Sequence, residues 1–241
     1  PMNDKLDSAK YLDAIQNIFK HSPLAYANAG DITDKLNDYK DLAFEQFKEN
    51  QFYEAASLYK ALVEKCLEHM DYINDDEGKM GDFIFQVFSY YRSATEKLEL
   101  DLDWFHGETI KLYLEEDYGF SSEIARLMLN LLTKDNYKIL EDVIKKELNK
   151  ISSNYKKEKL ANLLLKIYHK VDNERLYFET CKLFSTQSWE RYILAADKYE
   201  QTGRMEKAVE KYEEGLTKSD QYRELIEEKY ERFKQRMLGL S

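Results

Sequence analysis

The residues of this sequence that could perform chemistry are few, and their spacing matches no catalytic or metal-binding motif. Cys66 and His69 lie three residues apart, so they would share one face of a helix. They supply two ligands, whereas a structural zinc site needs four. We therefore expect Cys66 in the core, His69 at the edge of the solvent, and no metal site.

A second group of polar side chains consists of Asp101, Asp103 and His106. Carboxylates beside an imidazole could act as general acid and base. Before a helix, the same pattern is typical of an N-cap with surface charge, and we favour that interpretation. Phosphate-binding glycine loops and the Gly-x-Ser-x-Gly motif are both missing from the sequence. We expect neither enzymatic activity nor a cofactor.

The elements that must carry these residues are predicted to be helices. The 241 residues include only two prolines and eight glycines, where average usage would give about 12 and 17. Sandwiches, barrels and doubly wound α/β folds need more of both residues for their turns. With 34% charged residues and no apolar run near 18 residues, the chain is expected to be a soluble all-α protein.

The apolar spacing predicts about twelve helices of 12–20 residues whose short connections make neighbours antiparallel. The first helix should end before Pro23, with Asp31 as the N-cap of the second and Ser121 or Ser122 as that of a later one. No linker is evident, so one domain, 1–241, is predicted, with possible sub-division near 73–79 or 151–154. The last three helices should begin near Ser188, Arg204 and Ser219.

Residues 192–216 carry a pattern of small and aromatic residues that suits a helix hairpin. Ala196 and Ala208 would let two helices cross closely, and Tyr199 and Tyr212 would fill the gaps beside them. Gly203 would supply the left-handed residue of the turn. This arrangement resembles the tetratricopeptide repeat, a unit of two antiparallel helices.

A second segment, 42–62, resembles the same repeat in Ala43, Ala55 and Tyr59. Gln46 replaces the usual aromatic residue, and Asn50 replaces the turn glycine, which asparagine can do because it tolerates positive φ. The resemblance implies a right-handed α–α superhelix of about six helix pairs, partly degenerate. An irregular helical bundle is the alternative.

In the resembling family, the first helix of each pair lines a concave groove. At 37–48 this places Lys40, Phe44, Phe47 and Lys48 in the groove, which would suit an acidic or amphipathic peptide. Alternatively, the two phenylalanines pack against an N-terminal helix at 4–20. At 190–201 the corresponding groove positions are Glu190, Ile193, Asp197, Glu200 and Gln201.

Asp75–Asp82 is similar to a segment of the helical regions that accompany SWIM zinc fingers. The Cys-x-Cys of the finger is missing, and an acidic loop at a helix N-terminus explains the residues as well. That resemblance gives an alternative function, a helical accessory module for DNA or RNA. It would use a basic face within 145–159.

Charge is divided unevenly along the chain. Residues 1–120 carry a net charge of −13 and residues 121–241 a net charge of +3. The basic stretch 134–170 contains no arginine, which weakens a nucleic-acid interpretation and favours a solvated helix face. Its candidate contacts to phosphate or to an acidic partner are Lys145, Lys146, Lys156 and Lys157.

The final segment, 219–237, has one apolar stripe and one charged face. It should cap the array, or alternatively form a dimer seam. Neither a signal pattern nor a cysteine framework is found, so a cytoplasmic protein that natively begins at Met2 is expected. The predicted function is a non-catalytic scaffold that binds a protein or peptide, as a monomer or weak homodimer.

Overall fold

The computed structural model describes residues 5–20, 27–184, 189–219 and 222–239, which are mostly helical. The predicted all-α class is confirmed, and the described residues contain the expected twelve α-helices. Contacts group the chain into two compact units, Pro1–Val143 and Ile144–Ser241. The division falls inside a helix, at neither of the two points suggested by the sequence, and the single domain stays a prediction.

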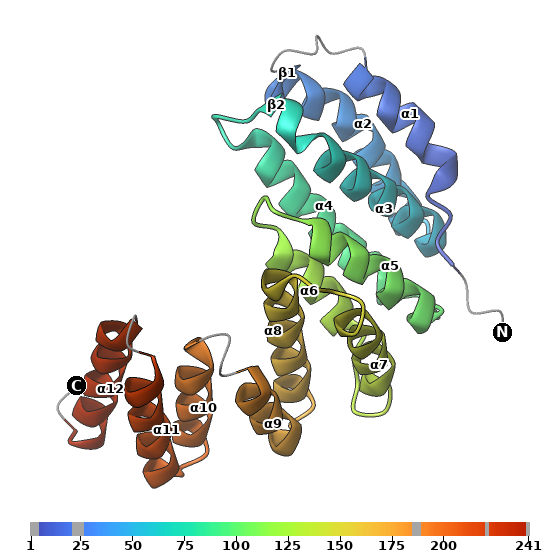
Figure 1. Cartoon of the computed structure of the whole chain (residues 1–241). Helices are drawn as coiled ribbons and strands as arrows, with labels where there is room; N and C mark the ends of the chain where they lie inside the picture. The colour runs from blue at the N-terminus through green and yellow to red at the C-terminus, as the bar shows by residue number, and fades with distance from the viewer. Residues whose placement is uncertain (1–4, 21–26, 185–188, 220–221, 240–241) are drawn as a thin grey trace. The chain divides into compact units, whose positions relative to one another are not determined.

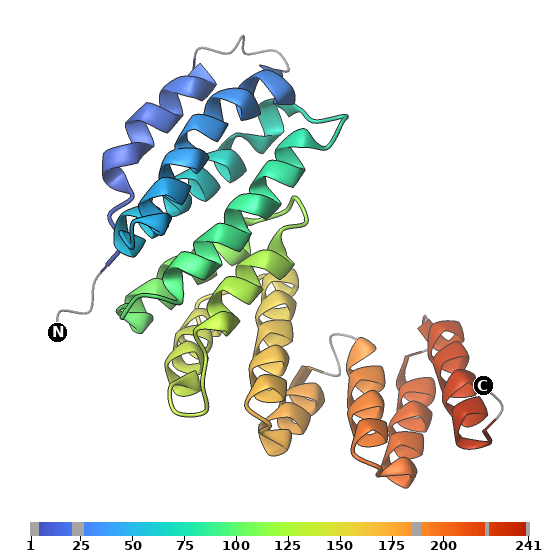
Figure 2. The same ribbon diagram turned by 180° about the vertical axis from the view of Figure 1, so that it is seen from behind.

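The first unit is built from antiparallel helices that follow one another along the chain (Figures 1 and 2). One pair of two-residue strands, which the sequence did not predict, joins the start of the second helix to the end of the third. The elements are α1 (Ala9–Lys20), β1 (Ala27–Asn28), α2 (Ala29–Lys48), α3 (Phe52–His69), a short 3-10 turn (Met70–Tyr72), β2 (Ile73–Asn74), α4 (Lys79–Thr95), α5 (Leu102–Glu115), α6 (Ser121–Asn130) and most of α7 (Tyr137–Leu148).

Helix α3 lies at the centre of this unit and packs against α1, α2 and α4. It can do so because its apolar residues cover several faces, as expected of a fully buried helix. Several of its buried residues are small, which lets neighbouring helices approach closely. Its fully buried side chains include Ala55, Ala56, Leu58, Tyr59, Ala61, Leu62 and Cys66.

Two predicted N-caps are wrong. Asn28 caps α2, since its Oδ1 accepts a hydrogen bond of 2.8 Å from the backbone of Gly30, and Asp31 lies in the first turn. Neither serine caps α6; the preceding Glu116 accepts hydrogen bonds from the backbone of Tyr118 and Phe120 and from the hydroxyl of Ser121. A longer carboxylate reaching forward thus replaces the expected local cap.

The second unit consists of two helix pairs and a final helix (Figure 1). Its C-terminal core gathers around Tyr212, whose ring lies 5.1 Å from that of Tyr230 and 5.4 Å from that of Phe233. The apolar stripe of the last helix is therefore buried against its own chain. The elements are α8 (Asn154–Lys170), α9 (Glu174–Phe184), α10 (Glu190–Gln201), α11 (Met205–Lys218) and α12 (Arg223–Met237).

Helix α12 begins at Arg223, four residues after the predicted start at Ser219. The predicted start at Arg204 is one residue before α11. Ser188, the expected start of α10, lies outside the described residues, as does Pro23. Across the described residues, none of the helices combines the length and the apolar character that crossing a lipid bilayer requires.

Three helix–helix turns share one backbone geometry: those between α2 and α3, α8 and α9, and α10 and α11. Each has a residue of positive φ after the first helix, namely Asn50 (62°), Asp172 (59°) or Gly203 (72°). The next helix starts two residues later in every case. The following amide reaches back to close each turn, in the bonds Gln51 N to Gln46 O (2.8 Å), Asn173 N to Tyr168 O (2.8 Å) and Arg204 N to Tyr199 O (2.9 Å).

Candidate functional site

Three of the four predicted groove residues lie on one face of α2. Lys40, Phe44 and Lys48 are spaced four apart, so they form a stripe along the helix. The ring of Phe44 is 38% exposed and lies 5.5 Å from the ring of Tyr90 on α4, which is 37% exposed. We call Lys40, Phe44, Lys48, Tyr90 and the nearby Gln86 the α2–α4 surface.

Both lysines of the α2–α4 surface stand beside aromatic rings. The ammonium of Lys48 lies 5.1 Å from the centre of the Phe44 ring and 2.6 Å from Glu45. Lys40 donates a 3.2 Å hydrogen bond to Gln86 Oε1 and lies 5.5 Å from the Phe83 ring. The result is an exposed aromatic pair with a cation on either side along α2.

Phe47, the fourth predicted residue, lies elsewhere. Its ring meets that of Phe52 edge-on at 5.2 Å, at the turn into α3. Phe44 meets Tyr90 of α4. The alternative expectation, that both rings pack against the N-terminal helix, stays a prediction.

Tyr59 lies beneath the α2–α4 surface. Its ring stacks on that of Tyr90 at 5.9 Å, and it is fully buried. Among the described residues its hydroxyl has no hydrogen-bond partner. Burial, with Tyr90 and Asp41 nearby, raises the pKa of this hydroxyl well above its ordinary value. The sequence marked Tyr59 as a packing residue but gave no sign of its unpaired hydroxyl.

The four lysines predicted to contact phosphate or an acidic partner belong to two helices. Lys145 and Lys146 are exposed on α7, whereas Lys156 and Lys157 are half-buried in the first turns of α8. The neighbouring Lys159 is buried, with its ammonium 5.5 Å from the Tyr155 ring. The basic stretch therefore presents its charges in two differently exposed pairs.

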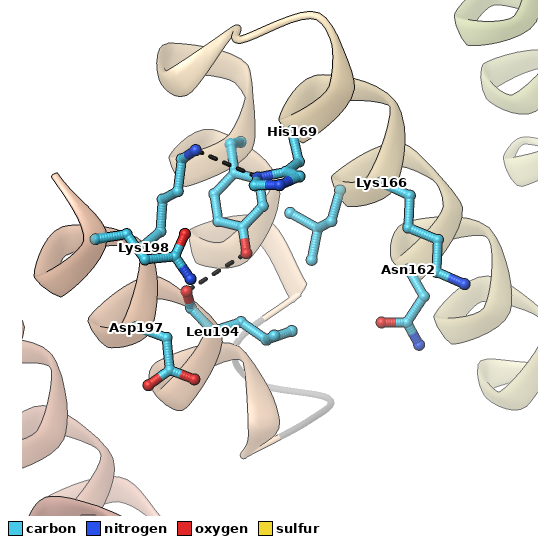
Figure 3. Close-up of a pocket in the computed structure, with 9 residues that line it drawn as sticks. Asn162, Lys166, His169, Leu194, Asp197 and Lys198 are labelled. Carbon is cyan, nitrogen blue, oxygen red and sulfur yellow. Dashed lines mark hydrogen bonds between the residues drawn. The ribbon is translucent and has the colours of Figure 1, made fainter. Parts of the chain in front are cut away.

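A hollow of about 290 Å³ lies within the second unit, between α8, α9 and α10 (Figure 3). We call it the α8–α10 hollow. Two of its residues, Asp197 and Gln201, are among the groove positions expected at 190–201. The full lining is Asn162, Leu165, Lys166, His169, Tyr177, Leu194, Asp197, Lys198 and Gln201.

A buried arginine supports one wall of this hollow. Arg191 on α10 is 1% exposed and donates a 2.8 Å hydrogen bond to Oδ1 of Asn162 on α8. It also forms an ion pair with Glu158. Sequence analysis missed Arg191, because a cation among polar helix residues resembles any solvated face.

Lys198 is the most unusual residue of the hollow. It is only 8% exposed; its ammonium lies 3.3 Å from Nδ1 of His169 and 5.9 Å from the ring centre of Tyr177 (Figure 3). The Tyr177 hydroxyl in turn donates to the Leu194 carbonyl at 3.4 Å. In the sequence, Lys198 directly follows Asp197, a predicted groove position.

Two residues of the candidate acid–base group, Asp101 and His106, have structural roles. Asp101 caps α5 by accepting a hydrogen bond of 3.1 Å from the backbone of Trp104, whereas His106 is buried. Burial lowers the pKa of His106 to about 4.

Cys66 is also buried, and His69 stacks on Phe19 at 4.5 Å. Within the described ranges, no three His, Cys, Asp or Glu side chains group as metal ligands would.

Comparison with known proteins gives no relative, since no family model, no curated protein and no solved structure matches the chain.

Proposed function

We propose that this protein is a non-catalytic scaffold that binds a peptide segment of a partner protein on the α2–α4 surface. The observation that carries the proposal is the stripe of Lys40, Phe44 and Lys48, with the Phe44 ring exposed against Tyr90. Aromatic residues are enriched in the cores of protein interfaces.

The three matching turns support a fold of repeated helix pairs, as the tetratricopeptide resemblance implies. Such a turn closes the hairpin at Asn50, at Asp172 and at Gly203, although the sequence suggested only the first and the last. In an array of this kind, α2, α4, α8 and α10 would be first helices of their pairs. Both the α2–α4 surface and the α8–α10 hollow use such helices.

The chemistry of the surface favours an acidic or amphipathic peptide. Lys40 and Lys48 offer ammonium donors to carboxylates, and the two rings offer apolar area to a side chain between them. Such contacts would strengthen recognition through charge complementarity and anchor it through the aromatic pair.

The test is affinity capture with a double variant, Lys40→Glu with Phe44→Ala, from the native host. It should lose the partners that the unaltered protein captures, while far-UV circular dichroism stays unchanged. The matched control is Lys35→Glu with Leu42→Ala, which alters an exposed lysine and an exposed apolar residue of the same helix. Recovery of the same partners by the first variant would refute the proposal.

The alternative function, an accessory module for DNA or RNA, depends on the lysines of α7 and α8. The exposure of Lys145 and Lys146 is the observation in its favour. Fluorescence-polarisation titration against duplex and single strands at two salt concentrations separates the alternatives. Binding that weakens steeply with salt, and that is lost in a Lys145→Glu, Lys146→Glu variant, would favour the nucleic-acid module.

A further inference from the structure

The ammonium of Lys198 is a buried cation with an incomplete set of partners. A buried charge is normally paired with an opposite charge, because removing it from water is costly. Its contacts are Nδ1 of His169, at 3.3 Å, and the ring face of Tyr177. Within the described part of the chain, no carboxylate lies within salt-bridge distance of it.

Two carboxylates of this unit, Asp197 and Glu158, interact with other groups. Asp197, which lines the hollow, accepts a 2.9 Å hydrogen bond from the Tyr212 hydroxyl. Glu158 forms an ion pair with Arg191, whose guanidinium also donates to Asn162. Neither carboxylate forms an ion pair with Lys198.

Two further polar residues of the lining, Lys166 and Asn162, lie on α8. Lys166 is on the same helix as His169, but its side chain points away from Lys198 (Figure 3). Because Oδ1 of Asn162 accepts from Arg191, the amide hydrogens of Asn162 remain as donors. Beside these groups the wall is apolar, formed by Leu165, Leu194 and the Tyr177 ring.

We infer that the α8–α10 hollow is a binding site for an oxyanion, carboxylate or phosphate, carried on an apolar body. The anion would pair with Lys198, and the apolar body would lie on Leu165, Leu194 and the ring of Tyr177. This site is separate from the α2–α4 surface and does not depend on the function proposed there. Its unit alone supplies every residue of the lining.

The test uses three small probes on the full chain at constant ionic strength: benzoate, phenyl phosphate and benzamide. NMR of side-chain resonances reports on the hollow through His169 and Tyr177. We expect benzoate or phenyl phosphate to shift both resonances with saturation, and the stronger of the two identifies the preferred oxyanion. Neutral benzamide, which has the shape of benzoate, should shift them far less.

Two variants tie the binding to the buried cation. Lys198→Met keeps the volume of the side chain and removes its charge. It should raise the dissociation constant of the anion at least about tenfold. Lys229→Met, an exposed lysine of α12, is the control and should leave it unchanged. Equal binding of benzamide, no saturable shift with either anion, or full affinity in a folded Lys198→Met protein would each overturn the inference.

Discussion

Arg191 and Asn162 join α8 to α10 through a hydrogen bond of 2.8 Å between a fully buried guanidinium and an amide oxygen. With Glu158 as the second acceptor, the arginine fixes the spacing of two helices that have no direct chain connection. Since Asn162 also lines the α8–α10 hollow, the arginine that joins the helices also holds one residue of the wall of the hollow.

Replacing Arg191 with methionine should therefore destabilise the protein. The change leaves Glu158 and Asn162 without their partner, which costs about 3 kcal/mol when a buried pair is broken from one side. Urea unfolding measures the loss. Arg175→Met is the control: this arginine forms an exposed pair with Glu179 and should cost less than about 0.5 kcal/mol. Similar losses in both variants would contradict the role given to Arg191.

Gly215→Ala should destabilise the crossing of α10 and α11. A Cβ at this position would lie 2.9 Å from Cβ of Tyr192 and 3.3 Å from Cδ1 of Ile226, so the backbones must separate. Overpacking of this kind costs about 1–3 kcal/mol. Gly107→Ala in α5 is the contrast, because nothing lies within 4 Å and alanine favours helix by about 0.5–1 kcal/mol. Thermal unfolding should show opposite signs.

Removing the hydroxyl of Tyr59 should not destabilise the first unit. Its hydroxyl is buried without a partner among the described residues, so Tyr59→Phe should leave stability unchanged or raise it by up to about 1 kcal/mol. Tyr212→Phe is the matched comparison, since that hydroxyl donates to Asp197 at 2.9 Å and its loss should cost about 1.5 kcal/mol. Chemical unfolding of both variants checks the contrast, and an equal loss would show that Tyr59 does have a partner.

His106 should make the protein less stable as the pH falls from 6.5 to about 4. Its pKa is lowered to about 4 in the folded protein, first by burial, while the unfolded chain titrates near 6.5. Between pH 6.5 and about 4 the unfolded state binds a proton at this histidine and the folded state does not. The free energy of unfolding therefore declines by up to about 1.4 kcal/mol per pH unit. His106→Leu should remove this part of the decline. A stability difference between the two proteins that does not vary with pH would contradict the prediction.

The helical class could be read from the sequence because the shortage of proline and glycine excludes folds rich in tight turns. Helix ends were predicted less well. Asn28 and Glu116 replace the expected caps. The cap is the side-chain oxygen that lies within hydrogen-bond distance of the free amides, and several nearby oxygens differ in this distance by only a few ångströms. The short pairing of β1 with β2 joins residues 46 positions apart and leaves no local pattern.

The candidate site was predicted only in part, because contacts within one helix follow from residue spacing and contacts between helices do not. Lys40, Phe44 and Lys48 share a helix face by spacing alone, so their proximity follows from the sequence. Tyr90, their aromatic neighbour, is brought to them by the packing of α4 on α2. The environment of Lys198 could not be predicted at all, since a lysine's burial depends on helices that approach it from elsewhere in the chain.

The turns at Asn50 and Asp172 have the backbone shape of the turn at Gly203 without its glycine. A positive φ costs a residue other than glycine about 1–2 kcal/mol, a cost that asparagine and aspartate lessen by bonding locally. These three turns thus share a backbone geometry that their residue types share only in part. A sequence profile that demands glycine would recognise one of these hairpins and pass over the other two.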